Sequence, residues 1–335
     1  MPTRGRSSIS PAKLPPVHSP IDLSRYIQRR HFRAYERDMA RSTYGYGVDL
    51  RRTRWLTTSL AGQTPLRALE HAWFAVADEL MAGELRFPAD SGDIPILSEI
   101  VEVAKLLHTT PPAIRLLTPA ARRSGDWGLV TPLGDPRGSD EWLVLDVEAL
   151  ERQPPAERAF LLGMGLGHLH CGHGALFLAH LVAHRRRGHR VLRAILRPWV
   201  RVAAFSGDRA GLLAAGDLRA AIAALDTSIA TSPKWAPRFP PLEVRAVALE
   251  EFSETTVAAR FRARKRRDGH EITLEEDLQA IAGPPKTPGE DGEDATEAPP
   301  GDSAPASDEA TAGVPDDAWT LARCDHRLTT RLGLF

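Results

Sequence analysis

The sequence predicts a mainly helical α+β fold, in which a short β-sheet packs on one apolar, histidine-rich helix and a disordered acidic tail follows. Three observations lead to this prediction. Apolar residues recur at helical spacing in several segments of the 335-residue chain. Three short β-like runs stand between two of these segments. A stretch dense in Pro, Gly, Asp and Glu then occupies residues 283–317.

The first part of the chain is predicted to hold a flexible arm over 1–20 and a helical segment over 21–92. The arm carries Arg, Ser and Pro but no apolar run, so it does not have the pattern of a secretory signal. Helical patterns cover 21–50, which ends in a Tyr-Gly-Tyr-Gly turn, and 64–85, where Pro65 is expected at the first helical position.

The central residues, 93–282, are expected to form the main domain. The pattern predicts strands at 114–117, 127–130 and 142–145, and helices at 94–108, 154–183, 203–225 and 242–267. The helix at 154–183 is the most apolar and contains four histidines, which makes it too polar for a membrane span.

Composition excludes several classes of protein. A hydrophobic share of 42% suits a folded core, and equal numbers of basic and acidic residues, 43 each, give no overall attraction to nucleic acid or anionic lipid. Cys171 and Cys324 are too few for a disulfide framework. A cytoplasmic protein is therefore expected, and the Arg- and Ala-rich, Lys-poor composition favours a bacterial source.

Two motifs carry the chemistry. A zinc hydrolase of the H-E-x-x-H type places two His on one helix face to bind the metal, and the Glu activates the bound water. Residues 157–173 contain Leu166-Gly167-His168, which matches the end of H-E-L-G-H, and 204–213 contains a later Ser-Gly-Asp-Arg-Ala-Gly run.

From residue 94 to 225 the order of elements and motifs resembles the zinc metallopeptidases of the HtpX and CAAX-prenyl-protease type. The resemblance implies that Met164 replaces the first His, Gly165 the general base and Ala204 the downstream Glu ligand. His168 and Asp208 are the retained family positions. The resemblance therefore implies a degenerate member, a pseudopeptidase without a cofactor that acts as a protein-binding or regulatory scaffold, because loss of a base alone costs about 10²- to 10⁴-fold in rate.

Structural roles are open for the retained residues: His168 as a hydrogen-bonded core histidine and Asp208 as a cap within the fold. An active zinc-dependent metalloendopeptidase is the alternative, with His168 joined by His170 or His173 and by Asp208 as a non-standard ligand set. Cys171 is not expected to be a nucleophile, because no base with an orienting carboxylate stands beside it in sequence.

A second histidine set offers another zinc site. If the helix continues through Gly172 and Gly174, then His173, His180 and His184 lie at i, i+7 and i+11, close to one face. No carboxylate stands between His180 and His184, and the two glycines are also able to break the helix.

The expected partner is a polypeptide, bound in the former substrate cleft. Residues 318–335 are expected to form a terminal docking helix, which packs either on this chain or on a partner. The basic runs 185–187 and 262–267 are expected to be solvated faces that pair with the acidic stretch, so no nucleic-acid role is assigned.

Overall fold

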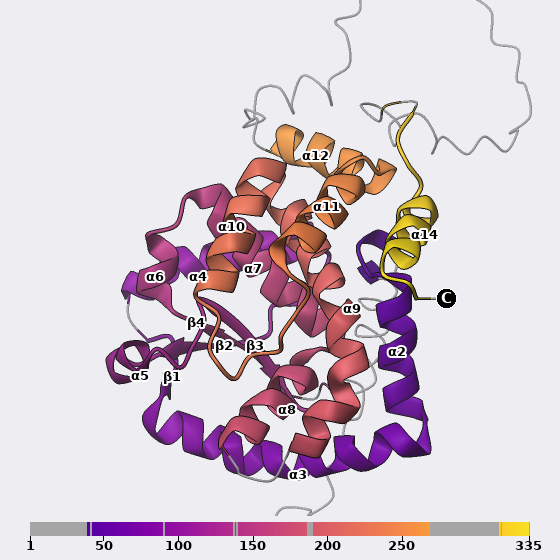
Figure 1. The fold of residues 1–335 in the computed structure, drawn as a ribbon. Helices are drawn as coiled ribbons and strands as arrows, with labels where there is room; N and C mark the ends of the chain where they lie inside the picture. Colours follow the sequence, from indigo (N-terminus) through magenta and orange to yellow (C-terminus); the bar gives the residue numbers. More distant parts are fainter. Residues whose placement is uncertain are drawn as a thin grey trace, which may run out of the picture. The chain divides into compact units, whose positions relative to one another are not determined.

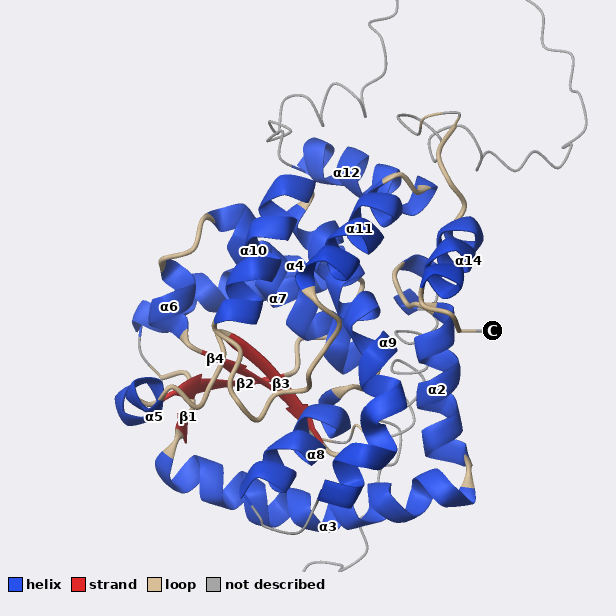
Figure 2. Ribbon diagram, viewed as in Figure 1, coloured by secondary structure: helices blue, strands red, loops and turns tan. Residues whose placement is uncertain are grey.

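The computed structural model describes residues 39–40, 42–89, 91–136, 138, 140–185, 190–268, 315 and 317–334. Helices surround one small sheet, and the sheet packs on the helix that carries His168 (Figures 1 and 2). The predicted fold class, mainly helical α+β, is confirmed. The predicted arm 1–20 and nearly all of the predicted linker 283–317 lie outside the described residues.

The first long helices are α2 (Gly47–Thr58) and α3 (Leu60–Gly83). Helix α2 begins at the last residue of the predicted turn, Gly47, and both tyrosines of that turn are buried. Helix α3 starts earlier than predicted, because the Ser59 hydroxyl caps it by accepting a hydrogen bond from the backbone of Gly62. Pro65 therefore lies inside the helix rather than at its first position.

The sheet has the strand order β1-β2-β4-β3, formed by β1 (Leu85–Arg86), β2 (Ala113–Leu117), β3 (Val130–Gly134) and β4 (Glu141–Leu145). The β2–β4 pair is parallel and the other two pairs are antiparallel. Strand β3 begins where the predicted strand 127–130 was expected to end. Trp127 lies before it, and its indole donates to Glu84.

Two helices connect strands: α4 (Ile94–Leu106) follows the 3₁₀ turn η1 (Ser91–Asp93) and leads to β2, and α5 (Pro119–Ser124) lies between β2 and β3. A third short helix, α6 (Val147–Glu151), follows β4. The predicted helix at 154–183 is in fact two helices, α7 (Pro155–His170) and α8 (Gly174–Arg185). They are separated by a turn in which Gly172 has φ +78°, a conformation that favours glycine. This turn brings His173 back beside the last turn of α7.

Two further predicted helices are also divided. The chain forms α9 (Arg190–Ala215) and α10 (Leu218–Ala230), with a break at Gly216 (φ +72°), and then α11 (Leu242–Ser253) and α12 (Thr256–Asp268). Between α10 and α11 runs a proline-rich segment, residues 231–241, called here the 231–241 loop. None of the helices described is both long and apolar enough to cross a bilayer.

Helices α7 and α9 pack closely along a seam of small residues. A Cβ on Gly163 would lie 2.5 Å from the Ala214 Cβ, and one on Gly167 would lie 2.4 Å from the Ala210 Cβ. Both distances are shorter than van der Waals contact allows, so the two helices meet at a spacing that only glycine permits. This seam fixes the position of His168, one residue after Gly167.

The terminal helix α14 (Leu321–Arg331) packs on α11 of its own chain (Figure 1). Two residues of this helix, Cys324 and Leu328, are buried. The Asp325 carboxylate accepts a hydrogen bond from the Gly47 backbone at the first turn of α2. Arg209 Nη1 lies 2.7 Å from Asp325 Oδ1, close enough for an ion pair although without hydrogen-bond alignment.

Candidate functional site

A cavity of about 440 Å³ lies between β3, α7 and the 231–241 loop. Met164 and His168 line it from α7, Thr131 from β3, Phe177 from α8 and Arg245 from α11. The loop contributes the opposite wall, from Ser232 to Pro241. Met164 and His168, the two positions that the family resemblance would assign to zinc ligands, both line this cavity.

His168 is almost completely buried in the wall of this cavity. Its ring stacks on Phe239, with centroids 5.5 Å apart and planes at 8°, and meets the edge of Phe177. A Cβ on Gly207 would lie 2.6 Å from His168 Nε2, so α9 also needs a glycine here. Burial lowers the pKa of His168 well below its ordinary value, and electrostatic interactions with His173 and with the charged Arg245 lower it further.

A chain of buried hydrogen bonds runs from His168 to Asp49. The Nδ1 atoms of His168 and His173 are 2.9 Å apart, and His173 Nε2 lies 3.1 Å from Asp49 Oδ1. Asp49 also accepts from the Trp199 indole at 3.0 Å and from the Ser206 hydroxyl at 2.5 Å. The Asp49 carboxylate thus accepts hydrogen bonds from three different side chains.

These partners assign the tautomers of both rings. With Nε2–H of His173 donating to Asp49, Nδ1 of His173 is the acceptor and His168 Nδ1–H is the donor. His168 Nε2 then carries a lone pair rather than a proton. This arrangement agrees with the low pKa of His168, since it holds that ring in its neutral form.

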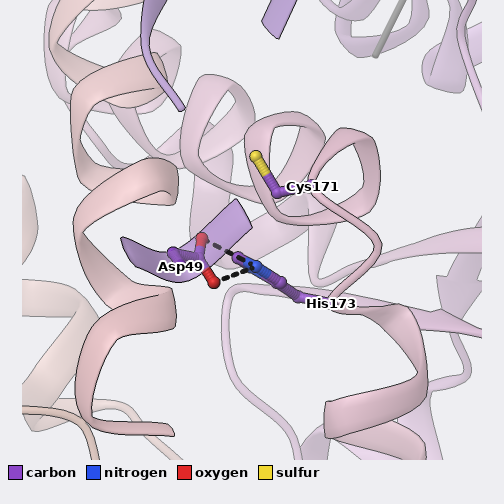
Figure 3. A group of neighbouring side chains, drawn as sticks. All are labelled: Asp49, Cys171 and His173. Carbon is purple, nitrogen blue, oxygen red and sulfur yellow. Dashed lines mark hydrogen bonds and ion pairs between the residues drawn. The ribbon is translucent and has the colours of Figure 1, made fainter. Parts of the chain in front are cut away.

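Asp49, Cys171 and His173 form the one group of three metal-ligand residues found in the described part of the chain. All three are buried, and their ligand atoms lie within 4.8 Å of one another. Figure 3 shows interaction lines between Asp49 and His173, while the sulfur of Cys171 points away from that pair. Both nitrogens of His173 are already used, so a metal ion would have to displace its bond to His168 or to Asp49.

The residues at the family zinc positions do not fit a zinc ion. Met164 offers a thioether, 3.9 Å from an Arg245 Nη, and Ala204 is a buried methyl group. A Cβ on Gly165 would lie 2.5 Å from Val130 Cγ1, so this helix face touches the sheet and leaves no room for a Glu. One imidazole, that of His168, remains.

Asp208, the other retained family position, has a structural partner. Arg245 donates to both of its carboxylate oxygens, at 2.8 and 2.5 Å, and both side chains are almost fully buried. The alternative zinc site, made of His168, His170 or His173, and Asp208, would need this carboxylate, and both of its oxygens are already bound to Arg245. Of that set, the structure brings His168 and His173 together, and it directs His170 to the hydroxyl of Tyr44 instead.

The second histidine set does not share one helix, because the break at Gly172 leaves His173 outside α8. His180 is buried, and its Nε2 has no hydrogen-bond partner among the residues described. Burial and the charge of Arg193 lower the pKa of His180 to about 4. A hydrogen bond with the Trp235 backbone has the opposite, smaller effect. His184 is exposed near the end of the helix.

Sequence reasoning missed Asp49, Trp199 and Arg245. Nothing near Asp49 in the sequence relates it to His173, which lies 124 residues further along. The glycine pairs at i and i+4 on α7 (Gly163, Gly167) and on α9 (Gly207, Gly211) were a usable signal, because such spacing marks a close helix–helix contact.

Comparison with protein-family models, with curated proteins and with solved structures finds no match to this chain. The function is therefore argued from the cavity and its residues alone.

Proposed function

We propose that the chain is a catalytically degenerate, metallopeptidase-like protein that binds an extended polypeptide in the cavity beside β3 without hydrolysing it. The observation that carries this proposal is the cavity itself. Its floor contains Met164 and His168, at the positions where the resembled family binds zinc, and a strand at the edge of the sheet lies alongside.

The edge position of β3 supports a polypeptide ligand. Strand β3 pairs with β4 on one side, and the cavity lies against its residues Val130, Thr131 and Pro132. An extended peptide binds to such an edge by adding a strand, and its alternate side chains then enter neighbouring pockets. A proline within a strand, here Pro132, is also typical of an edge, because it has no N–H to donate to a neighbouring strand.

The chemistry of the walls suits the same ligand. Phe177 and Phe239 present apolar surface, whereas Thr131, His168 and Arg245 place a few polar groups among them. Binding sites commonly combine mostly apolar walls with a small number of fixed polar groups.

Hydrolysis lacks its usual parts in this cavity. The zinc positions hold a thioether and a methyl group, and Gly165 leaves no carboxylate to activate water. The remaining imidazole, His168, is buried and packed against α9. Loss of a metal-activated water together with its general base removes the family mechanism.

The test is fluorescence anisotropy with a panel of short, labelled, unstructured peptides. Ser232→Trp places an indole at the cavity wall and is expected to abolish binding, because Ser232 lines the cavity and is exposed. Thr58→Trp, an equally exposed position at the end of α2, is the matched control and should bind normally. Peptide binding unaffected by Ser232→Trp, or zinc-dependent cleavage of casein, would refute the proposal.

A further inference from the structure

We infer that this cavity selects polypeptides that carry carboxylate side chains, and that Lys234 and Arg238 are the residues that select them. The inference rests on the proposed function and names its ligand class. Three basic side chains line the cavity, those of Lys234, Arg238 and Arg245, and no Asp or Glu is among its lining residues.

The three cations do not have equal roles. Arg245 is buried and its charge is compensated by Asp208. Lys234 and Arg238 are exposed, and neither forms an ion pair with another residue in the part of the chain that the structure describes. The two loop residues therefore supply the uncompensated positive charge at the rim of the cavity.

The 231–241 loop holds these cations in place through buried anchors. The Trp235 indole donates to the backbone carbonyl of Asp126 at 2.6 Å, and its ring meets Trp127 edge to face, with centroids 5.7 Å apart. Phe239 stacks on His168 further along the loop. Trp235 and Pro237 are buried, whereas Lys234 and Arg238, which flank them, are exposed.

Prolines reduce the freedom of this loop further. Four of them lie between residues 233 and 241: Pro233, Pro237, Pro240 and Pro241. Each fixes its own φ near −65° and restricts the residue before it. The entropy lost on binding is smaller for a wall that is already ordered, so the two cations are preorganised for an anionic ligand.

The occupant is an acidic, extended peptide rather than a nucleic acid. The edge of β3 offers backbone hydrogen bonds, which a peptide uses and a sugar–phosphate chain does not. Two uncompensated cations are also few for a nucleic acid, whose affinity grows with the number of phosphates contacted. Lys234 and Arg238 can each form one exposed ion pair with a peptide carboxylate. Together these two pairs are expected to lower the dissociation constant by about two- to thirtyfold relative to an uncharged peptide.

The experiment uses the full chain and two labelled peptides of the same sequence, one with Glu and one with Gln at every acidic position. The Glu peptide is expected to bind more tightly, by about two- to thirtyfold, and to lose this advantage as salt is raised. Lys234→Glu/Arg238→Glu should reverse the preference. Arg67→Glu/Lys105→Glu makes the same change of charge at exposed positions that do not line the cavity, and should leave the preference intact.

The outcomes separate the two proposals. Equal affinity of the wild-type protein for both peptides, blocked by Ser232→Trp, would overturn the selectivity and leave peptide binding in place. No binding of either peptide would overturn the proposed function. Tighter binding of single-stranded RNA than of the Glu peptide, lost in Lys234→Glu/Arg238→Glu, would show that the cavity binds a nucleic acid and not an acidic peptide.

Discussion

The Asp208 carboxylate and the Arg245 guanidinium form a two-point ion pair that joins α9 to α11 in the interior of the protein. The pair lies under the cavity and holds the Arg245 side chain within 3.9 Å of the Met164 sulfur. Asp208 thus supports the wall of the cavity through Arg245, which lines it.

Removing one member of this pair should destabilise the protein strongly. Arg245→Met leaves Asp208 as an unpaired buried charge, which is expected to cost about 3 to 5 kcal/mol in the free energy of unfolding. Urea denaturation followed by circular dichroism measures it. The double variant Asp208→Leu/Arg245→Met should recover most of the loss, and a single variant within about 1 kcal/mol of the wild type would contradict the buried pair.

Acidification should destabilise the protein through His180. Its folded-state pKa, about 4, lies below the ordinary value of 6.5, so the unfolded state binds more protons between these values and stability falls as pH falls through this range. The contribution is about 3 kcal/mol, and the low pKa of buried His168 acts in the same direction.

Denaturation at a series of pH values checks this dependence. His180→Leu should flatten the loss of stability between about pH 6.5 and 4, whereas His184→Leu, at an exposed position of the same helix, should not. An unchanged pH profile for His180→Leu would mean that another group causes the loss.

The seam between α7 and α9 should not tolerate a single added methyl group. Gly167→Ala would place its Cβ 2.4 Å from that of Ala210, so it is expected to cost about 1 to 3 kcal/mol. Gly83→Ala, at the end of α3, has nothing within 4 Å of its added Cβ and should be neutral or stabilising by up to about 1 kcal/mol. Thermal melts of the two variants provide the comparison, and equal melting temperatures would show that the helices can separate without cost.

Metal analysis should find no stoichiometric zinc after incubation with the ion and desalting. The family positions retain one imidazole, and both nitrogens of His173 are already hydrogen-bonded. About one zinc per chain, lost in His173→Asn but retained in His180→Asn, would instead identify the Asp49–Cys171–His173 group as a metal site.

The sequence predicted the fold class and most of the helices, because apolar periodicity records which face of an element is buried. It left the break at Gly172 open and missed the one at Gly216, since one residue with positive φ ends a helix without disturbing the apolar pattern on either side. It also missed β1, which is only two residues long.

The candidate site was predictable only in part. Met164 and His168, which the motif singled out, both line the cavity, but the partners that fix His168 come from distant segments. Asp49 and Phe239 lie on either side of α7 in sequence, and only the packed structure brings them to the two histidines. Long-range contacts of this kind leave no local pattern.

Helix α14 has a consequence for the order in which the protein is made. Its residues emerge from the ribosome after every other described element, yet they complete contacts formed by much earlier ones. Until Asp325 arrives, the first turn of α2 lacks the side-chain acceptor of its Gly47 N–H, and the guanidinium of Arg209 lacks the carboxylate that lies 2.7 Å from it. A chain that lacked α14 would therefore leave this guanidinium without the Asp325 carboxylate, so α14 supplies the charge partner of a residue made more than a hundred positions earlier.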